Sequence, residues 1–194
     1  MRRIVASLSA MLMLATVTAV AQEPPKSSHK GMAKAGGAKS DSAVISKATS
    51  AAPPDIGRNA AVMGMTDGKM KELRPGTNGW MCMLDASGNS MCLDKEWQAW
   101  GDAWMNKKDP PKPKGVGVAY MLNGDTGASN TDPYATKRTA DNKWVVTGPH
   151  IMLLPTDVSQ LESYPTDWTK GGPWVMWKGT PYAHIMVPTK SMSK

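Results

Sequence analysis

The first 21 residues constrain the fold most, because they have the form of a secretory signal peptide and leave the rest of the chain to build a domain. Two arginines precede an uncharged apolar run over residues 4–20, and an Ala-Val-Ala sequence lies at residues 19–21. This pattern is typical of a cleaved export signal. A single membrane anchor is the alternative, but the serines and threonines within the run favour cleavage. We therefore expect an exported protein, periplasmic or extracellular, with no stable membrane insertion after cleavage.

Residues 22–41 are predicted to form a disordered basic linker. They consist mainly of Pro, Lys, Ser, Gly and Ala, with Met32 as the single large apolar side chain. Such a segment buries too little surface to offset its ordering entropy. The net charge of +7 lies mostly in the signal and linker, since residues 51–194 hold 16 basic and 14 acidic side chains. This near balance of charge in the folded part argues against nucleic-acid binding. The basic linker is expected to be a solvated tether, and contact with an anionic envelope component is the alternative.

Cys82 and Cys92 are the only cysteines of the chain. In an oxidising compartment an even number of cysteines predicts a disulfide, here across the loop of residues 85–90. A reactive dithiol or a thiolate metal site is the alternative. The nine intervening residues fit neither a Cys-x-x-Cys redox motif nor a usual zinc spacing.

The order of strand-like and helix-like segments predicts a single α+β domain over residues 42–194. We expect a largely antiparallel sheet with one main helix, because helices and strands alternate too sparsely for a doubly wound fold. Asp67-Gly68 predicts a two-residue hairpin turn. The segments with strand character are 61–65, 70–73, 80–84, 116–122, 144–154, 173–178 and 182–187, and residues 41–49 suit a short helix or docked arm.

The main helix is predicted over residues 95–107. Asp94 suits its N-cap, and the two prolines after Asp109 end it. At about 100° per residue, three tryptophans form a stripe along one side of this helix. They are Trp97, Trp100 and Trp104. An indole stripe can bind sugars or cations, but at helical spacing it is more typical of a core, where indoles would replace the absent phenylalanines.

Five distinctive motifs lie within about residues 42–188. They are GTNGWMC at 76–82, MCLDKEWQAWGDAWMNKK at 91–108, NTDPYAT at 130–136, WVVTGPH at 144–150 and MWKGTPYAH at 176–184. Together they resemble an uncharacterised family of exported bacterial proteins. The resemblance implies one exported domain and implies no mechanism, because the family has no assigned activity.

The sequence His-Ile-Met occurs twice, each time in a segment with strand character that ends at a proline. Because strand side chains alternate, His150 and Met152 project from one face of their strand, as do His184 and Met186. If the two strands are neighbours in suitable register, these side chains can bind a soft ion such as Cu(I) or Ag(I). The alternative is that the methionines fill the core and the histidines form hydrogen bonds beside it.

A loop rich in small and oxygen-bearing residues, 123–134, is a second candidate site. Asp125, Asn130 and Asp132, with Tyr134 at the end of the loop, suit Ca²⁺ or a polar ligand. Their spacing does not match the EF-hand pattern. A well-capped surface loop is the alternative interpretation.

The sequence supports three functions and holds no complete catalytic or cofactor signature. The first is an exported, non-catalytic binding or interaction domain for an unidentified small ligand, metal or envelope component. The second is a periplasmic soft-metal binder that uses the two His-x-Met strands, with Cu(I) as its cofactor. The third is a small hydrolase or lyase in which His150, His184 and Tyr182 act as acid and base groups. No serine lies in a nucleophile-elbow context, which favours a protein that is not an enzyme.

Overall fold

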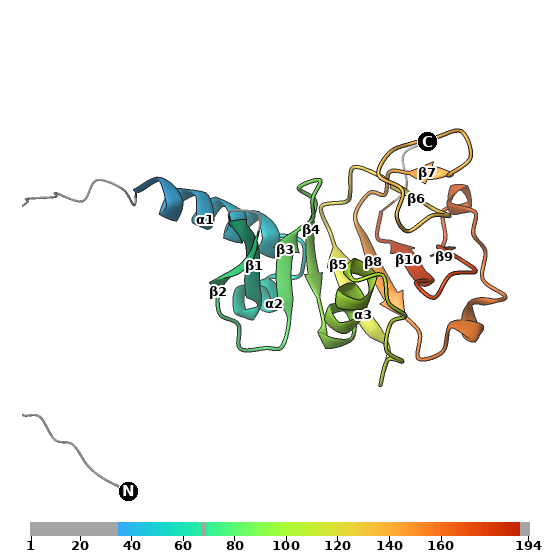
Figure 1. Ribbon diagram of the computed structural model, residues 1–194, viewed down its shortest axis with the longest axis horizontal. Coiled ribbons are helices and arrows are strands. Elements are labelled where there is room, and N and C mark those ends of the chain that lie inside the picture. Colours follow the sequence, from blue (N-terminus) through green and yellow to red (C-terminus); the bar gives the residue numbers. More distant parts are fainter. Residues whose placement is uncertain (1–34, 67–68, 191–194) are drawn as a thin grey trace, which may run out of the picture. The chain divides into compact units, whose positions relative to one another are not determined.

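The computed structural model describes residues 35–66 and 69–190. The predicted signal peptide and most of the predicted linker lie outside these residues. The described chain is a mixed α/β fold with one eight-stranded, mostly antiparallel sheet and few helices, as the sequence predicts (Figure 1). Within this part of the chain, no helix is both long and apolar enough to cross a membrane.

The large sheet has the strand order β2-β1-β3-β4-β5-β8-β10-β9. Its neighbouring strands are antiparallel except for β1 and β3, which are parallel. The bounds are β1 Ala61–Thr66, β2 Lys69–Arg74, β3 Met81–Leu84, β4 Ser90–Leu93, β5 Gly117–Met121, β8 His150–Leu154, β9 Trp174–Met176 and β10 His184–Pro188. Two short strands, β6 Ala128–Ser129 and β7 Trp144–Val145, pair in a separate sheet.

Helices cover both faces of the large sheet. They are α1 Ala35–Thr49, α2 Pro54–Asn59 and α3 Lys95–Met105, with the short 3₁₀ helices η1 Val158–Leu161 and η2 Trp168–Lys170. The first helix begins at Ala35, within the segment predicted as a linker. The third begins after Asp94, whose side chain accepts a hydrogen bond from the backbone N–H of Trp97 at 2.9 Å, as expected for an N-cap.

The two sheet faces belong to different cores because strand side chains alternate between them. On one face, α1 packs with residues of β1, β3 and β4; this core includes Ala48, Val62, Cys82 and Cys92. On the opposite face, α3 packs with residues of β4, β5, β8, β9 and β10. That core includes Leu93, Trp97, Trp100, Ala119, Met121, Met152, Trp174, Met176 and Met186. The second face holds the candidate site.

The single strand predicted over residues 144–154 is wrong, because the structure divides it into β7 and β8. Thr147 lies between them and bonds to a loop instead of a strand. Its N–H donates to Oδ1 of Asp125 at 2.9 Å, and its carbonyl accepts from the N–H of Asp125 at 2.8 Å. Pro149, which has no N–H, then separates this loop contact from β8.

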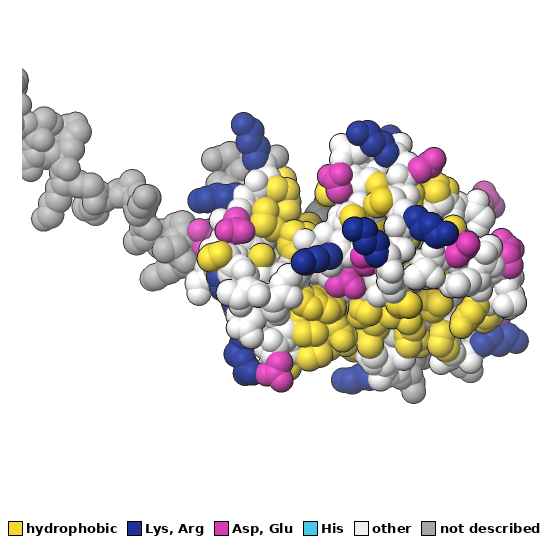
Figure 2. Space-filling model, turned by 90° about the horizontal axis from the view of Figure 1, so that it is seen from below, with side chains coloured by type: hydrophobic (Ala, Val, Ile, Leu, Met, Phe, Trp, Pro, Cys, Tyr) yellow, Lys and Arg dark blue, Asp and Glu magenta, His cyan; other side chains and the backbone are white. Residues whose placement is uncertain are grey.

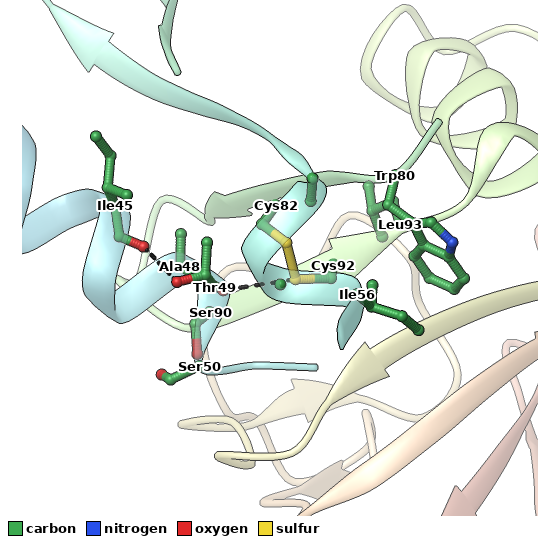
Figure 3. Close-up of a disulfide and its surroundings, with 12 residues drawn as sticks. Ile45, Ala48, Thr49, Ser50, Ile56, Trp80, Cys82, Ser90, Cys92 and Leu93 are labelled. Atoms are coloured by element: carbon green, nitrogen blue, oxygen red, sulfur yellow. Dashed lines mark hydrogen bonds between the residues drawn. A yellow bond between two sulfur atoms is a disulfide. The ribbon is translucent and has the colours of Figure 1, made fainter. Parts of the chain in front are cut away.

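The predicted disulfide is present and joins β3 to β4 (Figure 3). Cys82 and Cys92 lie directly opposite each other in the antiparallel register, and both are fully buried. They pack in the same core as Ala48 of α1. The disulfide therefore links two adjacent strands of the sheet, β3 and β4, beneath the first helix.

Replacing both cysteines with alanine (C82A/C92A) is expected to lower the free energy of unfolding by about 2–3 kcal/mol. The disulfide closes a ring of about 11 residues, and its loss restores that freedom to the unfolded chain. Urea denaturation of the variant and of the wild type measures the difference. Wild type with a reductant should lose a similar amount, and an unchanged urea midpoint in the variant would contradict a stabilising disulfide.

Candidate metal centre

The two His-Ile-Met strands are neighbours. In the antiparallel pair of β8 and β10, Met186 lies opposite Met152, and Pro188 lies opposite His150. The four predicted side chains share one face and are buried, with exposed fractions of 0% for His150, 8% for Met152, 2% for His184 and 2% for Met186. The register brings the two methionines together. It places one histidine on each side of this pair, toward opposite ends of the strands.

Each histidine also lies opposite a methionine that the His-Ile-Met repeat does not indicate. Met121 on β5 is paired with His150, and Met176 on β9 is paired with His184. Directly opposed residues of this kind have Cα atoms about 4.5–5.5 Å apart. Both methionines are buried. Each histidine therefore has one methionine opposite it and a second two residues along its own strand, all on the same face of the sheet. The alternation of strand side chains tells which face of its own strand each methionine occupies. Only the strand order tells which histidine it lies opposite.

The histidine rings have the orientation that a metal ligand needs. Nδ1 of His150 lies 2.7 Å from the carbonyl oxygen of Gly148, and Nδ1 of His184 lies 3.0 Å from that of Tyr182. Because a carbonyl only accepts, each Nδ1–H donates and each Nε2 presents a lone pair. A bond of this type commonly orients metal-bound histidines. Nε2 of His150 is buried and has no hydrogen-bond partner among the described residues.

Burial keeps both imidazoles neutral. Desolvation lowers the pKa of His150, although its bond to Gly148 and the nearby Asp125 carboxylate favour the charged form. Desolvation also lowers the pKa of His184 to about 4, against the opposing effect of its bond to Tyr182. Neutral imidazole is the form that binds metals. At neutral pH both rings are therefore ready to act as ligands.

Three indoles surround the ring of His184. The ring centroids of Trp97, Trp100 and Trp177 lie 5.2, 5.7 and 5.0 Å from the imidazole centroid. Each indole meets the imidazole almost perpendicularly, at 79° to 83°. Trp177 also has a φ of 57°, a conformation that is rare for a bulky residue. The indoles pack around the imidazole, which is only 2% exposed, so this end of the site is shielded from water.

Asp125, predicted as a loop ligand, lies near the other end of the site. Its Oδ1 accepts hydrogen bonds from the backbone N–H groups of Gly127 and Thr147, both at 2.9 Å. Burial raises its pKa, while these bonds and its interaction with His150 act in the opposite direction. It also lines a polar cleft of about 220 Å³. The other lining residues include Ser87, Asn89, Ser90, Asn123 and Thr126.

The three other predicted loop ligands have separate structural contacts. Asn130 is buried, and its Oδ1 accepts a hydrogen bond from Nε1 of Trp174 at 3.1 Å. Oδ1 of Asp132 accepts from the backbone of Tyr134 at 2.8 Å, and the Tyr134 hydroxyl donates to that of Tyr182 at 2.9 Å. These bonds lead to different parts of the fold. In residues 35–66 and 69–190, no three His, Cys, Asp or Glu side chains gather where they could hold a metal ion.

An apolar cleft of about 270 Å³ lies between the loops that follow α3 and β8. Its lining includes Trp100 and Pro110, Pro111, Pro113, Pro155 and Pro181. Seen from below, the molecule shows a broad apolar area bordered by charged side chains (Figure 2). Neither His150 nor His184 lines this cleft or the polar one. An acid–base enzyme needs its histidines within reach of a substrate, so the two clefts do not favour the hydrolase or lyase hypothesis.

Comparison of the chain with protein-family models, with curated proteins and with solved structures found no match. A fold does not by itself define a function.

Proposed function

We propose that the protein is an exported, non-catalytic binding protein for a soft monovalent cation, Cu(I) or Ag(I). The observation that supports this most strongly is the buried face of β5, β8, β10 and β9, which carries four thioethers and two neutral imidazoles. These side chains, called the metal centre below, are Met121, His150, Met152, Met176, His184 and Met186. Thioether and imidazole ligands suit Cu(I) and Ag(I), whereas Mg²⁺ and Ca²⁺ prefer oxygen.

The ligands of a first cation are His150, Met121 and Met152. Within residues 35–66 and 69–190, Nε2 of His150 is a buried acceptor without a partner, which costs about 1–3 kcal/mol in a folded protein. A bond to a cation would remove that cost. Met121 lies opposite His150, Met152 follows two residues along the strand, and methionine side chains adapt readily to a ligand. The carboxylate of Asp125 partly balances the added charge.

His184, Met176 and Met186 supply the same donors at the other end of the Met152–Met186 pair. Here no carboxylate of the described residues contributes to the pKa of the histidine. The three indoles around His184 instead provide cation–π attraction. Since burying an unbalanced charge is costly, we expect the His150 end to fill first and the His184 end to bind more weakly.

The disulfide supports the exported part of the proposal. A buried Cys82–Cys92 bond is typical of proteins from oxidising compartments, and it agrees with the signal peptide predicted for residues 1–21. It also removes both thiols as soft ligands. Thioethers and imidazoles are the soft donors that remain in the described chain.

Titration of the oxidised protein with Ag(I) tests the proposal. Ag(I) is stable in air, and binding near three indoles should quench tryptophan fluorescence. The double variant H150A/H184A is expected to bind at least about 100-fold more weakly, and M121L about 10-fold more weakly. Met105 is the matched control, because it is 60% exposed on α3, outside the metal centre; M105L should bind like wild type. Wild-type affinity in a folded double variant would exclude this site.

A further inference from the structure

Ten methionines project from the same face of the large sheet. The described residues contain eleven methionines, and only Met105 lies outside the sheet. The strand pairings connect the other ten on one face, from the Met65–Met70 pair to the Met152–Met186 pair. They are Met63, Met65, Met70, Met81, Met83, Met91, Met121, Met152, Met176 and Met186. The metal centre is thus the buried end of a larger thioether surface.

The exposure of these methionines falls from the β1–β2 hairpin toward the metal centre. Met65 and Met70 lie opposite each other and are 61% and 41% exposed. Met83 and Met91 are half-buried, and Met121 is only 5% exposed. A soft cation from solvent would therefore meet thioethers at the surface before it reached the buried ones.

The methionines between these ends lie on successive strands. Met83 on β3 lies opposite Met91 on β4, and Met121 on β5 lies opposite His150 on β8. The β4–β5 register pairs Leu93 with Ala119, which places Met91 in line with Met121. Neighbouring strands are about 4.8 Å apart. The flexible thioethers of adjacent strands can therefore bind one cation together during its transfer.

We propose that this methionine row, formed by Met65, Met70, Met63, Met83, Met91 and Met121, is the entry route of the cation to His150. The inference rests on the proposed binding of Cu(I) or Ag(I). In each transfer one metal–sulfur bond forms and one breaks, with no change of oxidation state and no proton moved. A buried site needs such a route, because a cation without ligands would pay several kcal/mol of desolvation in the apolar interior.

The rate of Ag(I) loading tests the route independently of the affinity. In stopped-flow fluorescence, M83L/M91L is expected to load at least about 10-fold more slowly, equivalent to about 1.4 kcal/mol in the barrier. Its final stoichiometry should equal that of wild type. The exposed variant M65T/M70T should also load more slowly and leaves the core unchanged. M105L is the control, with a wild-type rate expected.

NMR of ¹³C-methyl methionine separates the two proposals. On addition of Ag(I), the signals of Met121 and Met152 are expected to shift with stoichiometric binding, while those of Met65, Met70, Met83 and Met91 broaden by exchange. Wild-type loading rates in both row variants would overturn the entry route and leave the metal centre intact. Unchanged Met121 and Met152 signals would overturn the metal centre itself.

Discussion

Replacement of Trp174 with alanine is expected to lower the free energy of unfolding by about 3–5 kcal/mol. Trp174 is fully buried on β9, opposite Met186, and belongs to the core that contains the metal centre. Its Nε1–H donates to Oδ1 of Asn130 at 3.1 Å. The W174A change therefore creates a large cavity and leaves a buried amide oxygen without this donor. Urea denaturation followed by circular dichroism measures the loss.

Two further variants identify the source of the loss. W174F retains much of the buried area but removes the N–H, so it reports the bond to Asn130, expected to contribute about 1–3 kcal/mol. W168A removes an indole that is only half-buried at η2 and should cost less than W174A. If W174A destabilised the protein no more than W168A does, the packing described for β9 would be incorrect.

The class of fold could be predicted from local sequence signals. Asp94 indicated the start of α3, and alternation with turn residues indicated most strands, because caps and strand faces depend on neighbouring residues. The division of residues 144–154 into two strands was not predictable in this way. It depends on the pairing of Thr147 with Asp125, which lies in a different loop.

The candidate site was predictable in part. Alternation placed His150 and Met152 on one face. Met121 becomes a neighbour of His150, and Met176 a neighbour of His184, only through the strand order β5-β8-β10-β9. Strand order depends on pairing between distant segments, and the periodicity within one segment gives no information about it. The prediction of a ligand site in the loop of residues 123–134 also lacked information on long-range contacts. Asn130 has the chemistry of a ligand residue, yet its oxygen bonds to Trp174 of a distant strand.

Lowering the pH from 7 to 4 is expected to destabilise the metal-free protein by about 3 kcal/mol through His184 alone. Its pKa is about 4 in the folded protein, against an ordinary value of 6.5. Between these two values the unfolded chain binds the proton and the folded chain does not, so stability falls as the pH falls. The contribution is fully present above pH 6.5 and is lost as the pH approaches 4.

The shifted pKa values of two other groups of the site, His150 and Asp125, also change the stability with pH. The lowered pKa of His150 adds to the loss in acid, whereas the raised pKa of Asp125 opposes it, because the folded protein binds that proton more readily than the unfolded chain. Urea midpoints at pH values from 4 to 8, measured for wild type and H184Q, isolate the His184 contribution. The stability difference between the two proteins should shrink by about 3 kcal/mol between pH 7 and pH 4. A difference that stayed constant would mean that His184 is not buried as a neutral ring, and its Nε2 would then be a poorer ligand for a soft cation.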